Sequence, residues 1–410
     1  MKAFAAIYGF ELKKILRKKY ILILLAIMVG AVIYMNIFPL FETVDVAYVD
    51  ESKGFVFETV SRYEEIQLDR RFAKEDSGKL LDNAAAQPMR EMNRKYQEIY
   101  NTYEPELSCV LKNHYLVFTS LANLTVNPMA EKVPHIADFA YMCMKQRQVR
   151  EYINQSLTNE EKAYWDEKRG KIDIPFTLEY SEGYTEILEK AFWLNMMSFV
   201  FALIALCAIF SEDYGYHVRP ILICAKYGHW PQNLAKLAAG ETVAAGGVLV
   251  LFGLTCLIQF FVHGTDGFGT PIQMLSISFL CESSWPITGG EALWLFVGIS
   301  MLLALFAGAA AMFLSKLFRK AVPALALPMG LLMLSLVFSE RFYGGLWSQI
   351  SSYFPIHRLS VDFLKDEHLV MVGGVMLDCV SVTIVIYAGL TVIFLALCIC
   401  LCHRQWTDRK

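Results

Sequence analysis

The sequence offers few residue patterns that could carry out catalysis. Gly78-Lys79 and Gly170-Lys171 lack the preceding glycine and the hydroxyl residue of GxxxxGK[ST], the loop that holds the phosphates of ATP. Gly298-Ile-Ser300 is a weak match to a serine-protease pattern, and no HExxH motif occurs. We therefore expect no enzyme and no cofactor in this chain. An ATP-dependent process would need a separate ATPase chain that binds ATP and Mg²⁺.

Metal, disulfide and nucleic-acid sites are also poorly supported by the sequence. The ten cysteines are scattered, and no pair has zinc-ligand spacing with a second pair to match it. Cys109 and Cys143 fall in one segment and could form a bridge, although sequence alone does not give their distance. The net charge of −3 and the pI near 6.3 give no global basic patch. We expect no metal site and no nucleic-acid partner.

Two consecutive carboxylates, Glu212 and Asp213, form a distinctive polar feature. Ser211 can cap a short helix whose first turn carries both acids, which suits the positive end of a helix dipole. An apolar patch follows, and an element of this kind is suited to fill a groove in a partner protein. The alternative is an ordinary interfacial loop. The residues after the acids that shape this segment are Gly215, Arg219, Pro220, Ile221, Leu222, Ile223 and Lys226.

The first 19 residues predict an amphipathic helix. Lys13, Lys14 and Arg17 fall on its polar side, which is typical of a helix lying in the inner membrane interface. Glu11 sits towards the apolar side, where a free carboxylate is unfavourable. It is either a contact for a partner protein or the ion-pair partner of Lys14. The apolar side consists of Phe4, Ile7, Tyr8, Leu12, Ile15 and Leu16.

Six hydrophobic stretches without any charged residue must position these segments. Each has about 19 residues or more, which at 1.5 Å per residue covers a ~30 Å hydrocarbon layer. Core helices of soluble proteins are usually shorter and carry a polar face. The sequence predicts an all-α integral membrane protein with six spans, at 20–40, 191–211, 242–262, 292–315, 321–339 and 379–402. The remaining segments are 1–19, 41–190, 212–241, 263–291, 316–320, 340–378 and 403–410.

The distribution of lysine and arginine predicts the orientation. Among the short segments, these residues concentrate in 1–19, 212–241, 316–320 and 403–410, whereas 263–291 contains none and 340–378 contains only Arg341, Arg358 and Lys365. The positive-inside rule therefore places both termini in the cytoplasm. We expect a multi-pass protein of a cell membrane, most simply a bacterial plasma membrane, with the lipid bilayer as its surroundings.

The segment 41–190 is too long for a loop and is expected to form a mostly helical extracytoplasmic domain. Thr158 and Glu161 form a capping box for one short helix. Local β structure is expected only in places such as 172–180. Longer helices are predicted at 58–74, 84–103 and 136–155.

Two further features concern the membrane body. The uncharged stretches 268–281 and 343–357 suit interfacial or re-entrant helices at the outer end. The spans contain no charged residue of the kind that couples transport to an ion gradient. Asn195 and Gln259 are their main polar side chains, and hydrogen bonds between helices explain them most simply.

In its N-terminal helix and in the segment around 210–237, the sequence resembles the membrane subunit of ABC transporters of the ABC-2 type. That family has a basic amphipathic helix before its first span. Its second span ends in a phenylalanine, followed by acidic residues, a glycine, an apolar run and an alanine-lysine pair. The corresponding residues here are Phe210-Ser-Glu212-Asp213-Tyr214-Gly215, Ile221-Leu-Ile223 and Ala235-Lys236-Leu237. The domain at 41–190 and Pro220 depart from the family pattern.

The resemblance implies a function and a set of partners. It implies a coupling helix seated in a cytoplasmic ABC ATPase, and a path formed with a second permease subunit, identical or homologous. We expect the permease subunit of an ATP-driven exporter for an amphipathic or lipid-like molecule, such as an antimicrobial peptide. The competing hypothesis is a membrane sensor whose external domain binds a ligand. The implied coupling residues are Glu212, Asp213, Tyr214, Gly215, Arg219, Ile221, Leu222, Lys226 and Lys236.

Overall fold

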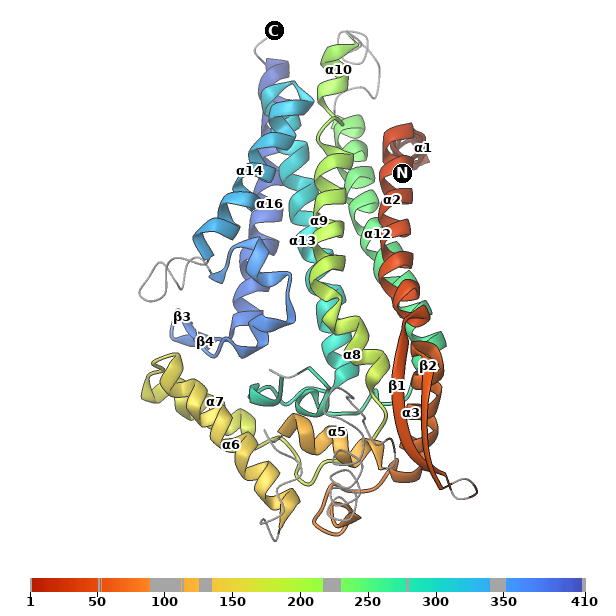
Figure 1. Cartoon of the computed structure of the whole chain (residues 1–410). Coiled ribbons are helices and arrows are strands. Elements are labelled where there is room, and N and C mark those ends of the chain that lie inside the picture. The colour runs from red at the N-terminus through yellow and green to blue at the C-terminus, as the bar shows by residue number, and fades with distance from the viewer. Residues whose placement is uncertain are drawn as a thin grey trace.

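Long helices run side by side in a bundle, and a smaller domain lies at one end of it (Figure 1). The N- and C-terminal labels both lie in the half of the molecule away from this domain. The computed structural model describes residues 2–50, 52, 54–88, 112, 114–124, 135–216, 230–277, 280–339 and 352–407.

Five helices are long and apolar enough to cross a membrane, which confirms the predicted membrane-helix character. A helix satisfies its backbone polar groups internally, so an apolar sequence of this length can enter lipid. The five are α2 (Lys19–Ile37), α9 (Ala191–Leu206) with α10 (Ser211–Gly215), α12 (Trp230–His263), α13 (Gly289–Phe318) and α16 (Cys379–Thr407). The N-terminal helix α1 spans Lys2–Leu16.

The fifth and the third predicted spans each coincide with a helix. The stretch 321–339 is a helix with those bounds, α14 (Ala321–Ser339). Its described apolar part, Ala321–Ser335, is shorter than a spanning helix, so a sixth span stays a prediction. The third predicted span, 242–262, lies within α12, which begins earlier, at Trp230. Pro231 lies in the first turn of α12, where the missing N–H costs nothing, and no further proline follows before residue 242.

The polar residues of the bundle join helices, as the sequence predicts. The Asn195 side chain of α9 donates to the Leu359 carbonyl over 2.6 Å and accepts from the Ser300 hydroxyl of α13. Gln259 of α12 donates to Asn36 of α2 over 2.7 Å. These bonds fix the helices against one another in an otherwise apolar core.

The chain is mostly helical, as the sequence predicts, but a β-hairpin begins the domain where a helix was expected from residue 58. Strand β1 (Thr43–Asp50) pairs antiparallel with β2 (Gly54–Ser61), so residues 58–61 are strand instead of the expected helix. In β1 the first four residues, Thr43–Val46, alternate polar and apolar, whereas β2 contains the apolar run Phe55–Phe57. Helix α3 starts only at Arg62, where Ser61 and Glu64 form a capping box.

The remaining elements of the domain are helical and follow the sequence more closely. Helix α6 matches the predicted helix, and the predicted capping box begins α7. Leu80 and Thr177 form the local β contact expected within 172–180. The expected helix at 84–103 lies mostly outside the described residues. The helices are α3 (Arg62–Asp76), α5 (Tyr115–Leu124), α6 (Ile136–Asn154), α7 (Asn159–Arg169) and α8 (Glu182–Glu189).

The segments that connect the helices at this end pack against the domain. Within 264–288, the described residues form 3-10 turns at Ile272–Met274 and Leu280–Glu282, and no re-entrant helix occurs among them. Met274 and Cys281 are buried in the domain's own core. The stretch 343–351 lies outside the described residues. Between 352 and 378 the chain forms two 3-10 turns, Pro355–Arg358 and Val361–Lys365, and a second hairpin, β3 (Val370–Val372) with β4 (Val375–Leu377).

Candidate functional site

The two carboxylates after α9 face the chain's own cations. Asp213 pairs with Lys236 of α12, whose side chain is 1% exposed, and lies 4.0 Å from the Lys14 ammonium. The Lys18 ammonium lies 2.6 Å from a Glu212 oxygen. A buried ion pair is costly to break because the remaining charge is left without a partner. The helix α10 is therefore held in place by α12 and by the N-terminal residues, including Lys18 before α2.

Helix α1 packs on α12 through both polar and apolar contacts. Glu11 is buried, lies 3.7 Å from Lys14, and accepts a hydrogen bond of 3.4 Å from Gln232. The Lys14 pairing is one of the two alternatives that the sequence leaves open. The hydroxyls of Tyr8 and Thr242 lie 2.9 Å apart. Among the other predicted interface residues, Ile15 is buried, Ile7 and Leu12 are half-buried, and Phe4 is exposed.

Cations and aromatic rings complete the contact of α10 with α13. The Phe210 ring lies 4.9 Å from the Lys316 ammonium and 5.6 Å from that of Lys236. Tyr214 lies 5.9 Å from Lys316 and 5.4 Å from the Arg319 guanidinium. The Ser315 hydroxyl accepts from the backbone of residues 210 and 211 at 3.2 and 3.0 Å. We call this network of α1, α10, α12 and α13 the charged end.

Sequence reasoning identified the acids Glu212 and Asp213 and the Glu11–Lys14 pair, but not the other partners at the charged end. The segments that contain Lys18, Lys316 and Arg319 were used only to predict orientation, and nothing in the spacing of these three residues shows which acid or ring each one meets. Gly215 ends α10, and a side chain added there would meet open space in the described part of the chain. Four expected coupling residues lie outside the described residues: Arg219, Ile221, Leu222 and Lys226.

Helix α12 carries charged residues before the predicted third span. Because α12 starts at Trp230, Lys236 and Glu241 belong to the same continuous helix as the apolar residues. Both carboxylate oxygens of Glu241 are buried without a hydrogen-bond partner among the described residues. One of them lies close to α13, since a Cβ added at Gly308 would be 3.5 Å from it. Glu241 directly precedes the predicted span 242–262, and no sequence pattern singled it out.

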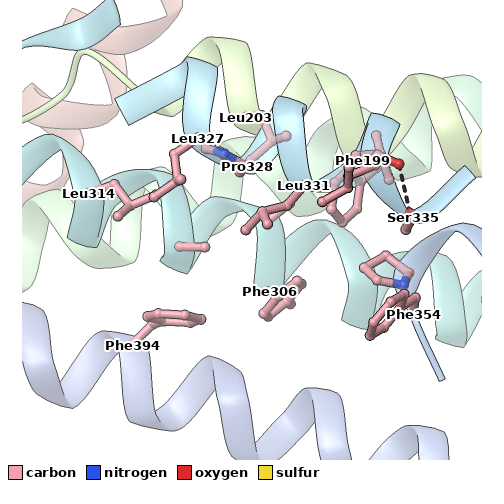
Figure 2. A pocket seen from close by; sticks show the side chains of 15 residues that line it. Phe199, Leu203, Phe306, Leu314, Leu327, Pro328, Leu331, Ser335, Phe354 and Phe394 are labelled. Carbon is pink, nitrogen blue, oxygen red and sulfur yellow. Dashed lines mark hydrogen bonds between the residues drawn. The ribbon is translucent and has the colours of Figure 1, made fainter. Parts of the chain in front are cut away.

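An apolar cavity of about 740 Å³ lies within the bundle (Figure 2). The rings of Phe306, Phe354 and Phe394 point into it from one side, and Leu327 and Leu331 of α14 approach from the other. Among its described lining residues, Ser335 is the only one with a polar side chain, and its hydroxyl already donates to the Leu332 carbonyl over 2.7 Å. The cavity therefore offers apolar surface from α9, α13, α14 and α16 without an unpaired hydrogen-bonding side chain.

The chemistry of metals and thiols adds no further site. In the described ranges, no group of three or more His, Cys, Asp or Glu side chains could hold a metal ion. Cys143 is a free thiol, and Cys109 lies outside the described residues, so the bridge between them stays a hypothesis.

Buried carboxylates of the domain lie where it meets the bundle. Glu182 of α8 accepts hydrogen bonds from the Ser276 hydroxyl over 2.7 Å and from Tyr115 over 3.4 Å, and burial raises its pKa to about 7. Asp69 of α3 lies 2.9 Å from the Lys112 ammonium, and burial still raises its pKa to about 6. We call this region the domain end.

Comparison with known proteins found no matching family model, no matching curated protein and no matching solved structure.

Proposed function

We propose that this chain is the membrane-embedded permease subunit of an ATP-driven exporter that moves an amphipathic or lipid-like molecule. The observation that carries the proposal is the apolar cavity between α9, α13, α14 and α16. Its volume of about 740 Å³ falls within the ~300–1,000 Å³ typical of ligand pockets. Because its lining leaves no described side-chain polar group to satisfy, an apolar ligand segment can occupy it without a desolvation penalty.

The energy source is proposed to be a separate cytoplasmic ABC ATPase, because the sequence has no phosphate-binding loop. The charged end supports a docking role. Its ion pairs join α10 to Lys14 of α1, to Lys18 before α2 and to Lys236 of α12, so a push on α10 would be passed to the helices of the bundle. Tyr216, just beyond α10, is 76% exposed and thus open to a partner. The lysines and arginines at this end favour a cytoplasmic location.

The arrangement in the membrane is also part of the proposal. A second permease subunit, identical or homologous, would complete the path, and α14 would form the sixth span. The domain formed by 41–190 would then lie outside the cell, over the exit. No specific observation favours the competing sensor function.

The cavity is tested by photo-crosslinking. We would reconstitute the chain in lipid nanodiscs with a fatty acid that carries a photoreactive group on its acyl chain. Labelling should map to α13 and α14, and A310F, which places a ring in the cavity, should reduce it several-fold. L249F is the matched control, because Leu249 is 58% exposed on α12. Equal labelling of the two variants would contradict a ligand site in this cavity.

Docking is tested by pull-down of a co-expressed ABC ATPase with this chain. The Lys18–Glu212 pair allows a charge swap, K18E/E212K, that restores the pair with opposite polarity. We expect E212K to lower ATPase recovery and the swap to restore it, since the role of the pair is to hold α10. Low recovery with both variants would assign the contact to the Glu212 charge itself. Full recovery with E212K would contradict docking through α10.

A further inference from the structure

The short hairpin β3–β4 has an unusual composition. Its strands pair Val370 with Leu377, Met371 with Met376, and Val372 with Val375. Gly373 and Gly374 form the turn with φ of 59° and 85°, which suits a two-residue hairpin turn that needs positive φ at both positions. Every residue of the hairpin is therefore apolar or glycine.

Apolar side chains at the tip of this hairpin are exposed. Met371, Val372 and Val375 are 61%, 56% and 60% exposed. A water-facing hairpin normally alternates, with one polar face, because successive side chains point to opposite sides. Here both faces are apolar, and a side chain added at either turn glycine would meet nothing within 4 Å in the described part of the chain. Contiguous exposed apolar surface of this kind marks a contact with lipid or another protein.

Polar contacts hold the base of the hairpin in place. The backbone N–H of Leu369 donates to Glu161 of α7 over 2.9 Å. On the other strand, Asp378 accepts from Lys168 over 3.1 Å and from the Tyr164 hydroxyl over 3.2 Å. The apolar tip thus projects from a base that is fixed by contacts with Glu161 and Lys168 of α7.

The hairpin is continuous with a membrane-crossing helix. Helix α16 begins at Cys379, two residues after β4, and its outer face is apolar, with Val385 and Val392 exposed by 61% and 65%. Figure 1 shows the hairpin at the side of the bundle, near the end of α16 that faces the domain. That end is where α16 would enter the bilayer.

We propose that the tip of the hairpin, Met371–Val375, inserts into the interfacial layer of the lipid bilayer. The partner is lipid, because the tip is uncharged on both faces and continues the apolar outer surface of α16. Strands of three residues offer little backbone edge for pairing with a second chain. The inference rests on α16 crossing the membrane and does not depend on export.

The test uses a fluorescent amino acid in place of Val375, with the full chain reconstituted in phosphatidylcholine vesicles. Lipids brominated on their acyl chains should quench this probe at least twofold, and aqueous iodide should not. The matched control is the same probe at Ile153 of α6, which is 74% exposed in the domain and should show the reverse. Quenching at Val375 by iodide alone would overturn the proposal. Protection from both quenchers would also overturn it, because it would indicate cover by protein.

A polar variant sharpens this test. M371S/V372S removes apolar surface from the tip and leaves the base contacts of Glu161 and Asp378 in place. We expect lipid quenching at Val375 to fall by half or more with an unchanged melting temperature. Unchanged quenching in a folded variant would show that the base alone sets the depth and would count against apolar insertion.

Discussion

Two acids of the charged end, Asp213 and Glu212, and Glu182 of the domain end are held in different ways. At the charged end, Asp213 and Glu212 each lie against an ammonium group of the same chain. At the domain end, Glu182 accepts hydrogen bonds from two neutral hydroxyls, and its pKa is raised to about 7. Opposite charges fix the position of an element, whereas neutral donors leave a buried acid that takes up a proton near neutral pH. The first arrangement suits a rigid mechanical contact, and the second makes a junction sensitive to pH.

The largest effect should come from removing one partner of the buried pair at the charged end. Among the described residues, K236M leaves Asp213 with Lys14 as its remaining cation, 4.0 Å away, and should destabilise the chain by about 3–5 kcal/mol. Thermal unfolding in detergent measures this loss. In the double variant K236M/D213N no charge is left unpaired, so most of the stability should return. An unchanged melting temperature for K236M would remove the proposed contrast between the two ends.

A smaller, pH-dependent effect is expected from E182Q at the domain end. The folded pKa of Glu182 is about 7, above its usual 4.5, so the folded state retains a proton between these values. The contribution of Glu182 to stability is therefore greatest at low pH and falls as pH rises towards 7. E182Q, which mimics the protonated acid, should match the wild type at pH 5 and exceed it by on the order of 2 kcal/mol at pH 8. A difference that is constant from pH 5 to 8 would contradict this account.

The partly buried Lys18–Glu212 pair of the charged end should contribute less than the Lys236–Asp213 pair. E212Q removes the ion pair with Lys18, whose side chain is 14% exposed, and should cost about 1 kcal/mol or less in the free energy of unfolding. E167Q provides a control, since Glu167 and Lys171 form a solvent-exposed pair on α7, worth about 0.3–0.5 kcal/mol. High salt should reduce both effects. A loss with E212Q as large as that with K236M would show that the whole charged end acts as one buried network.

Local patterns predicted several elements because their signals lie within a few residues. The capping box of Thr158 and Glu161 and the helix from Ile136 are confirmed. The strands of the first hairpin were missed because residues 58–61 were joined to the run of helix formers that follows. Helix α12 begins 12 residues before the predicted span at 242, because charged residues limit an uncharged span but do not end a helix.

The candidate sites depend on contacts between distant residues. The sequence showed that Glu212 and Asp213 follow an apolar helix, but not that their partners would be Lys18 and Lys236. Any of several nearby lysines satisfies the same pattern, and only the packing of α1 on α12 selects among them. No sequence pattern indicates the cavity. Phe306 and Leu331 have the same apolar character as lipid-facing residues, and only the packing of the helices shows that they line a cavity.

The sequence by itself determined the long apolar helices, the amphipathic N-terminal helix and the position of the acids after α9. These follow from composition and short-range periodicity, which act within one helix. The tertiary structure alone decided which charges are paired, which carboxylates are buried beside neutral donors, and where the helices leave a cavity. The physical reason is that burial and Coulomb energy depend on distances between elements that are up to two hundred residues apart in the chain, as for Lys18 and Glu212.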